Sequence, residues 1–483
     1  MKKLIHTLII TTLFVTMSSS CMDALEEKVF SQTTPDNLLD NENGIMALLG
    51  SCYGFTQNAD RQRINMGEYP TDIAFQTGGF ENGIAINFLT FSWDPSVGLF
   101  NMYYNIPYQA IRDANVLLEN IDGADISEEK INLYKSEARF LRAFNYYRLY
   151  NWFGPTPLRQ SSSDELVLPR ANEEELLSFI EQELMDVVPF LPDPGNEEAY
   201  GRATKGAALG VLTKFYLNTK QWQKCADVAL QVIELGYYEL FPVFEDMLKV
   251  ENEGNREMIM VNAAIPQMFA NNYMPAAFPI GFRSWPEKGL IMQSNWNNPQ
   301  TQYRLRDGFY DSFEEGDLRK EPILTAYINN AGNTINLRDQ PDNTRSFRYW
   351  PDPDAQGENH GNDVPEIRYA DILLSRAEAL NELNGLNQES LNLINEVRFR
   401  AGLEDLEMSD FSGETDLRTH ILMERSWEFY SEGLRREDLI RHGEFINSAI
   451  SRGVSNARPH HNRYPLPLGA MDSNPELVQN EGY

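Results

Sequence analysis

Two segments without helical periodicity carry aromatic rings interleaved with amide, carboxylate and guanidinium side chains. The first spans Asp72–Trp93 and the second spans Phe282–Tyr303. An aromatic ring offers a large flat apolar face, and polar groups beside it fix the orientation of a ligand. This mixture suits a pyranose ring, whose faces are apolar and whose hydroxyls need hydrogen-bond partners. The candidate ligand-binding residues are Asp72, Gln76, Phe80, Asn82, Trp93, Arg283, Trp285, Asn295, Trp296 and Tyr303.

Each of these rings has a second interpretation, which is packing beneath a loop. Aromatic residues bury more area than any other type, and a loop needs such anchors to stay ordered. The alternative stays open for each ring individually, and the hypothesis of a binding site rests on the cluster as a whole.

Glu424 and Glu428 are the carboxylates whose spacing most resembles a catalytic pair. They lie one helical turn apart and are surrounded by arginines in the sequence. Arginines lower the pKa of a carboxylate, whereas an acid catalyst needs a raised pKa. The chain also has no G-x-S-x-G, P-loop or H-E-x-x-H motif. We therefore predict no catalytic residue and no enzymatic activity.

Two short motifs could suggest a metal ion. Asp352–Asp363 partly imitates a calcium loop, but Gln356 occupies a ligand position, Pro353 interrupts the loop, and helices do not flank it on both sides. A solvated acidic loop is the better interpretation. His460 and His461 are adjacent and lack an evident third ligand. We expect no metal and no cofactor, with calcium as the weaker alternative.

The stretch Met1–Cys21 has the form of a bacterial secretory signal. Two lysines precede about 12 mostly apolar residues, and Ser18–Ser20 lead into a single cysteine. The apolar run is shorter than the roughly 20 residues that span a bilayer. The serines before Cys21 resemble a lipobox, so residues 1–20 are expected to be removed and Cys21 to carry lipid. An ordinary signal peptide that leaves Cys21 as a thiol is the alternative.

Composition excludes several classes of function. The 483 residues have a formal charge of −30, and loss of Lys2 and Lys3 with residues 1–20 would make it −32. Such a surface repels phosphates, so no nucleic-acid partner is expected. Cys52 and Cys225 cannot form a disulfide framework, and they either pair or lie buried apart.

Helical periodicity is concentrated at the two ends of the chain, around a middle of 236–365 rich in Pro, Gly and Asn. Residues 60–97 are expected to form loops with short strands, and the tail 457–483 is expected to be a loop. The predicted helices are Gly44–Phe55, Leu99–Ile121, Glu128–Phe153, Asn172–Val188, Lys205–Asn218, Gln221–Leu235, Arg368–Leu383, Gln388–Ala401, Thr415–Glu432 and Leu434–Ile450.

These helices pair into hairpins of roughly 34 residues, which is the period of tetratricopeptide-like stacking. The predicted fold class is mostly α, a tetratricopeptide-like helical-hairpin scaffold with a large loop-rich region of short strands. We divide the mature chain into regions 21–240 and 241–483, which are expected to pack intimately as one globular unit.

Several long motifs resemble one family. NDVPEIRYADILLSRAEALNELNG at Asn362–Gly385 is similar to the signature of the SusD/RagB family of outer-membrane lipoproteins from Bacteroidetes. INEVRFRAGL at Ile394–Leu403 and ILMERSWEFYSEGLRREDLIRHGEF at Ile421–Phe445 follow at the family's spacing. The ending YPLPLGAMDSNPELVQNEGY and the helix segment at Glu137–Leu158 also fit.

The resemblance implies a surface-exposed, lipid-anchored protein of the outer membrane that captures oligo- or polysaccharide. Family members pass their ligand to a SusC-like TonB-dependent porin, and their ligand sites are built from variable loops. Asp72 lies where many members carry a binding-loop aspartate. The acidic residues after Cys21 (Asp23, Glu26 and Glu27) resemble a surface-export signal of this phylum.

Other interpretations of the same scaffold stay open. One is a RagB-like peptide-binding lid of a peptide importer, and another is a helical surface that binds only the porin. The charged residues of the C-terminal motifs are expected to be structural, because their helical spacing favours interhelical ion pairs. They are Arg368, Asp371, Arg376, Glu378, Arg398, Arg400, Glu424, Arg425, Glu428, Glu432, Arg435 and Asp438.

Overall fold

The computed structural model describes residues 39–57, 61–79, 82–266, 270–298 and 300–483. The predicted signal segment, Cys21 with the acidic residues after it, and Phe80 lie outside the described residues and stay predictions.

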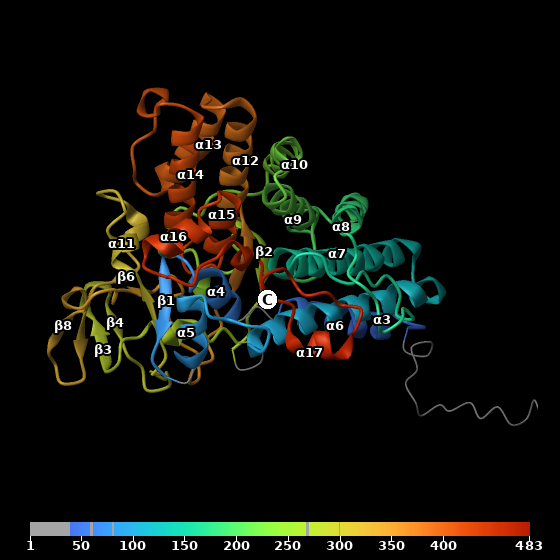
Figure 1. Ribbon diagram of the computed structural model, residues 1–483, viewed down its shortest axis with the longest axis horizontal. Coiled ribbons are helices and arrows are strands. Elements are labelled where there is room, and N and C mark those ends of the chain that lie inside the picture. The colour runs from blue at the N-terminus through green and yellow to red at the C-terminus, as the bar shows by residue number, and fades with distance from the viewer. Residues whose placement is uncertain (1–38, 58–60, 80–81, 267–269, 299) are drawn as a thin grey trace, which may run out of the picture.

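Long helices of the N-terminal half stack as antiparallel neighbours (Figure 1). Side-chain oxygens begin several of them: Ser127, Asn172 and Thr204 each accept a hydrogen bond from a backbone N–H of the first turn. The predicted bounds hold to within two residues. These helices are α3 (Glu42–Thr56), α6 (Gly98–Asn120), α7 (Glu128–Phe153), α8 (Glu173–Val187), α9 (Lys205–Asn218) and α10 (Trp222–Glu234).

A second group of helices comes from the C-terminal half. Its members are α12 (Tyr369–Asn384), α13 (Gln388–Arg400), α14 (Glu414–Phe429), α15 (Arg435–Arg441), α16 (Phe445–Ser451) and α17 (Leu468–Ser473). The single helix predicted for Leu434–Ile450 is wrong, because Gly443 adopts a φ of +77° and separates α15 from α16. The expectation that the tail is entirely loop is also wrong, since α17 forms within it.

The middle of the chain forms short strands, as predicted. A four-stranded sheet has the order β4-β3-β7-β8, and three two-stranded sheets pair β1 with β5, β10 with β2, and β6 with β9. The strands are β1 (Ala74–Thr77), β2 (Met258–Asn262), β3 (Phe282–Trp285), β4 (Leu290–Ile291), β5 (Gln302–Leu305), β6 (Ile323–Leu324), β7 (Ala326–Asn329), β8 (Thr334–Asn336), β9 (Arg345–Ser346) and β10 (Val364–Arg368).

Three short helices occur where loops were expected: α4 (Arg61–Glu68), α5 (Asn82–Thr90) and α11 (Asp307–Tyr310). The sequence RQRINMGE of α4 has too few apolar residues to show a helical period. Its Ile64 and Met66 are nevertheless fully buried. Tertiary packing therefore forms this helix, and local pattern does not reveal it.

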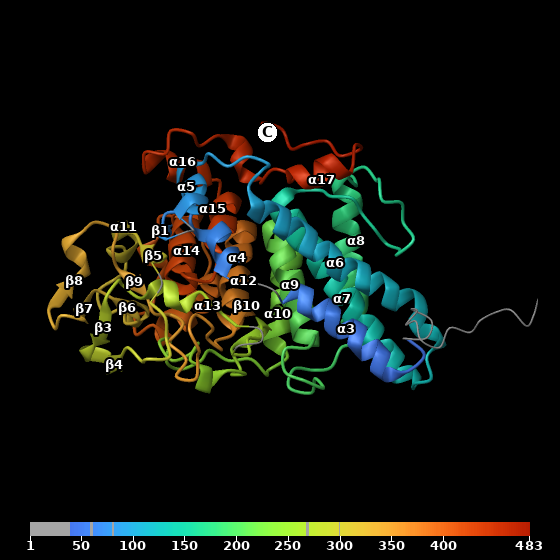
Figure 2. The same cartoon turned by 90° about the horizontal axis from the view of Figure 1, so that it is seen from below.

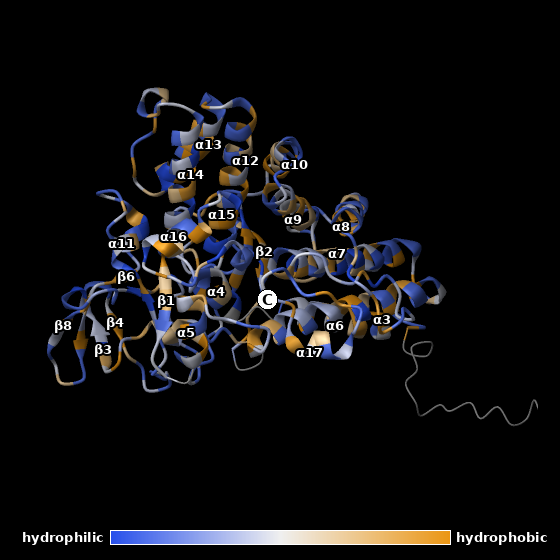
Figure 3. Cartoon of the chain, viewed as in Figure 1, coloured by the Kyte–Doolittle hydropathy of each residue, from blue (hydrophilic) through white to orange (hydrophobic). Residues whose placement is uncertain are grey.

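Buried residues of both halves form one contiguous core, which joins α12 to α9 and α10. Seen from below, α16, α17 and the C-terminal tail follow one edge of the molecule, and the β3-β4-β7-β8 region lies at one end (Figure 2). Hydrophilic and hydrophobic residues share the same helices, as expected for amphipathic elements (Figure 3). Cys52 and Cys225 are free and buried apart from each other. No helix among the described residues is long and apolar enough to cross a bilayer.

Candidate functional site

The charged residues of the C-terminal motifs form a buried ion-pair network, as predicted. Arg368 lies at its centre and is 1% exposed. Its Nη1 lies 2.7 Å from Glu257 and 2.5 Å from Glu428, and its Nε lies 2.9 Å from Glu432. A guanidinium group can satisfy several carboxylates at once because it has five donors in a fixed plane. The network ties α14 to Arg368, the last residue of β10, and to Glu257, the residue before β2.

Glu424 and Glu428 belong to this network, and their surroundings exclude acid catalysis. Burial would raise the pKa of Glu424, but the charges and hydrogen bonds of Arg319 and His420 together outweigh burial and lower the pKa to about 2. The pKa of Glu428 is likewise about 2, since Arg400, Arg368 and Arg319 together outweigh its burial. A carboxyl group that stays ionised cannot donate a proton at neutral pH.

A second cluster of ion pairs joins α9, α12, α14 and α15. Arg425 contacts Asp371 at 2.8 Å and Asp438 at 2.9 Å, and Lys214 contacts Asp371 at 3.0 Å. Arg441 pairs with Glu378 through two hydrogen bonds of 2.5 and 2.8 Å. Lys214 comes from outside the recognised motifs, so it shows that the N-terminal and C-terminal halves share this cluster.

The two segments predicted to bind ligand are neighbours in space. Strand β1 pairs with β5 in antiparallel register, so that Gln76 lies opposite Tyr303 and Thr77 lies opposite Gln302. The fold therefore brings candidate residues of the first segment next to candidate residues of the second.

Several predicted ligand contacts are nevertheless buried. Trp93, Trp285, Trp296 and Tyr303 are 6% exposed or less, and Gln76 is fully buried. These rings cover core residues, which leaves no open ring face for stacking. These five residues pack within the protein here, and their assignment to ligand contact stays a prediction.

Their partners explain why they are buried. Trp93 donates from Nε1 to the hydroxyl of Tyr483 (2.8 Å) and packs against the tail, so it anchors the C-terminus. Trp296 donates to the carbonyl of Asp352 (2.9 Å), and Trp285 packs on Phe347. Aromatic residues in loops serve here as anchors, which is the alternative left open by the sequence.

Three other predicted residues retain exposed surface and stay predictions. Arg283 is exposed on β3, and Asn82 is exposed at the start of α5, where its side chain accepts from the N–H of Gly78 at 3.3 Å. Asn295 is half-buried and donates to the carbonyls of Pro353 and Ala355.

The loop that partly imitates a calcium site is held by its own backbone. The carboxylate of Asp352 accepts from the N–H groups of Asp354 and Gly361. Asp363 accepts from the hydroxyl of Tyr200 and the N–H of Ala264. These carboxylates brace loops, and no group of metal-ligating side chains occurs among the residues that the structure describes.

Asp72 lines a cavity of about 460 Å³, a volume within the ~300–1,000 Å³ typical of small-molecule sites. It is held by Arg435, whose Nε and Nη2 each lie 2.8 Å from one carboxylate oxygen. Burial opposes ionisation of Asp72, but the charge and hydrogen bonds of Arg435, together with the charge of Arg452, outweigh burial and lower the pKa of Asp72. The cavity opens between β1, α11, α14, α15 and the end of α16, which gather in one region of Figure 1.

Sequence reasoning missed the other charged residues of this cavity. Arg306, Asp342 and Arg452 line it together with the pair Asp72–Arg435. They come from three distant segments, which tertiary folding brings to one cavity. No sequence spacing could have linked them. We call this cavity, defined by Asp72, Arg306, Asp342, Arg435 and Arg452, the arginine cavity.

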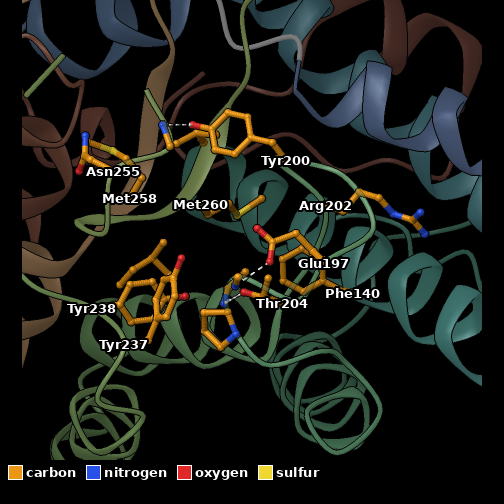
Figure 4. A pocket seen from close by; sticks show the side chains of 18 of the residues that line it. Phe140, Glu197, Tyr200, Arg202, Thr204, Tyr237, Tyr238, Asn255, Met258 and Met260 are labelled. Carbon is orange, nitrogen blue, oxygen red and sulfur yellow. Dashed lines mark hydrogen bonds between the residues drawn. The ribbon is translucent and has the colours of Figure 1, made fainter. Parts of the chain in front are cut away.

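Two further hollows differ in size. The pocket of Figure 4 lies among Tyr200, Tyr237 and Tyr238, so it has the aromatic and polar groups that a sugar site needs. Its volume of about 60 Å³ holds only a few waters. A cavity of about 330 Å³ lies between α6, the 157–166 loop and α17, where Tyr104 and Tyr108 are neighbours with ring centroids 5.2 Å apart. This second cavity also has the size of a ligand site.

Glu68 on α4 lies buried beneath the β1–β5 pair. Burial raises the pKa of Glu68 to about 7, although hydrogen bonds from the Tyr303 hydroxyl and the Gly433 N–H lower it in part. This carboxyl group therefore takes up a proton in the folded state at a pH where the unfolded chain has released it.

Glu68→Gln is expected to become more stable relative to the parent as pH rises. Because the folded pKa lies above the unfolded value of 4.5, the stabilising contribution is complete below pH 4.5 and is lost as pH rises toward 7. The difference in free energy of unfolding between variant and parent should shift by about 2–4 kcal/mol between pH 4.5 and pH 8. Urea unfolding at both pH values measures it.

Glu444→Gln is the matched control, because it removes a carboxylate that is exposed to water. A pH-independent difference between Glu68→Gln and the parent would show that Glu68 is not protonated in the fold.

The described helices, short sheets and loop-lined cavities define a helical-hairpin scaffold protein. Comparison with known protein families identifies the family of this scaffold. A family model described as SusD family matches residues 324–483, and one described as starch-binding associating with outer membrane matches residues 23–217. The chain belongs to the SusD/RagB family.

Curated relatives span most of the chain. SusD-like protein P25 of Formosa agariphila is 28% identical over 421 residues, covering 78% of this chain and 78% of that protein. The starch-binding protein SusD of Bacteroides thetaiotaomicron is 26% identical over 489 residues, covering 88% of this chain and 85% of that protein.

Solved structures share the fold. A laminarin-binding SusD-like protein matches with a TM-score of 0.78 at 24% identity, covering 92% of this chain and 100% of that one. A surface glycan-binding protein A of Bacteroides thetaiotaomicron, in complex with laminarihexaose, matches with a TM-score of 0.75 at 19% identity, covering 91% and 99%. The mostly helical fold class predicted from sequence is confirmed.

Proposed function

We propose that this protein captures oligo- or polysaccharide at the outer membrane and passes it to a SusC-like TonB-dependent transporter. The observation that carries the proposal is the match to a relative named as a starch-binding protein, which covers 88% of this chain. The family description of association with the outer membrane supports the proposed location.

The proposed attachment is a lipid on Cys21, with the folded domain exposed at the cell surface. Support comes from the signal-like form of residues 1–20 and from the acidic residues that follow the cysteine. Stable attachment needs more than one acyl chain, because each buried methylene contributes about 0.8 kcal/mol.

The structure supports binding without turnover. The carboxylate pair that most resembled a catalytic site is buried and ionised within the arginine network. The arginine cavity and the cavity beside Tyr104 both have the size of a ligand site, and Arg435 holds the Asp72 carboxylate of the arginine cavity through two hydrogen bonds.

The purified full chain is expected to bind at least one soluble polysaccharide with an affinity in the roughly micromolar to millimolar range. Calorimetric titration with starch, laminarin and other glycans measures binding, and a reducing-end assay on the same mixtures measures hydrolysis. Binding without release of reducing ends is the expected result.

Two results would contradict the proposal. Release of reducing ends would make the protein a hydrolase. Binding of extended peptides in place of every glycan would select a peptide-importing lid, which is the alternative left open by the sequence.

A further inference from the structure

The arginine cavity contains more positive than negative charge. Its three guanidinium groups face two carboxylates, those of Asp72 and Asp342. Asp72 is fully engaged by Arg435 in a two-pronged pair. Asp342 lies 4.0 Å from Arg306, which is the limit of an ion pair, and its carboxylate already accepts from the N–H of Asp307 at 2.7 Å.

Arg452 is the least satisfied of the three. Its Nη2 donates to the carbonyl of Pro70 at 2.8 Å. Its Nε and Nη1 are buried and have no hydrogen-bond partner within the described part of the chain. A buried donor without a partner is costly, and such groups in native proteins call for a ligand or another explanation.

Electrostatics agree with the geometry. Burial, together with the neighbouring charges of Arg306 and Arg435, lowers the pKa of Arg452 to about 10, although the carboxylate of Asp72 raises it in part. An anion placed between Arg306 and Arg452 would offset the cost of burying the Arg452 charge and the repulsion between the two guanidinium groups. The chain as a whole is strongly acidic, at a formal charge of −30, but salt screens charges beyond about 8 Å at physiological ionic strength. Charges within the cavity therefore dominate what it binds.

We propose that the arginine cavity binds the negatively charged substituent of an acidic sugar, a carboxylate or a sulfate, through Arg452 and Arg306. This inference rests on the proposed function and narrows its ligand class. Both substituents present oxygen atoms that match the planar fork of a guanidinium group, and a neutral hydroxyl cannot supply the missing charge. The uncharged remainder of the sugar would lie against the Phe309 side of the cavity.

Titrations of the full chain with three oligosaccharides of equal length test the proposal. The probes are an oligogalacturonate, a sulfated galactose oligosaccharide and neutral laminarihexaose. At least one charged probe is expected to bind more tightly than the neutral one, and the two charged arms separate carboxylate from sulfate. Arg452→Gln should weaken that binding about ten- to hundredfold, the effect of losing hydrogen bonds to a charged group.

The matched control is Arg256→Gln, which removes an arginine that is 47% exposed and does not line the cavity. It should leave binding of every probe unchanged. Arg306→Gln is a second variant, which keeps the test possible if Arg452→Gln does not fold, and it should weaken binding of the charged probe alone.

Three outcomes separate the hypotheses. Tighter binding of a charged probe that depends on Arg452 or Arg306 supports the proposal. Equal binding of charged and neutral probes, with both variants unchanged, overturns the proposal and leaves glycan capture standing. Failure of every probe, together with failure of the wider glycan panel, overturns both.

Discussion

Arg368→Met is expected to lower the free energy of unfolding by about 3–5 kcal/mol, a large part of the ~5–15 kcal/mol that a folded domain has. The side chain of Arg368 contacts Glu257, Glu428 and Glu432 and also donates to the backbone carbonyl of Glu428. Methionine keeps a similar length but removes the charge that three buried carboxylates share. Each would then have to take up a proton or admit water.

Urea unfolding followed by circular dichroism measures this loss. Arg418→Met is the matched control, because Arg418 lies on helix α14 of the same network but is 33% exposed. Exposed ion pairs contribute about 1 kcal/mol or less, so the control should unfold close to the parent. Equal unfolding midpoints for Arg368→Met and the parent would refute a stabilising role for the network.

The same network shows what sequence alone can predict. Charged residues recur at helical spacing in the motifs of α12, α13 and α14, so interhelical pairing could be foreseen from the sequence. The partners Glu257, Arg319 and Lys214 could not be foreseen, because they come from loops and from a helix far away in the chain. A local period identifies the helices, but only tertiary packing identifies which charges meet.

The bounds of the helices likewise divide into those that local sequence signals identify and those that they do not. Glu128–Phe153 and Lys205–Asn218 match the prediction, and each follows a polar N-cap residue whose side chain accepts a hydrogen bond from the first turn. The break between α15 and α16 was missed because it depends on one positive φ at Gly443, in a stretch that keeps a helical period.

The candidate site was the least predictable part. Asp72, which the family resemblance singles out, lines a ligand-sized cavity, and its contact with a ligand stays a prediction. The burial of the candidate tryptophans could not be predicted, because the sequence records that a ring is present in a loop but not which side of the loop faces water. Trp93 and Trp296 both point into protein, where each also satisfies its indole N–H.

Gly67→Ala is expected to lower the free energy of unfolding by about 3 kcal/mol or more, at or beyond the upper range for overpacking. A Cβ atom at this position would lie 2.0 Å from the carbonyl oxygen of Gly433 and 2.7 Å from its carbonyl carbon. The obstacle is backbone, so no side chain can rotate away. Gly433 is itself fixed by a φ of +82° and by its N–H bond to Glu68.

This contact also bears on ligand binding, because the turn at Gly433 leads directly into Arg435, the partner of Asp72 in the arginine cavity. A shift of the turn should therefore weaken glycan binding as well as lower the urea midpoint. Gly54→Ala is the matched control, since Gly54 is an exposed position on helix α3 with no atom within 4 Å of its added Cβ. Alanine there should stabilise the helix by about 0.5–1 kcal/mol. If both variants unfold like the parent, the close approach of α4 to the α14–α15 turn does not constrain the fold.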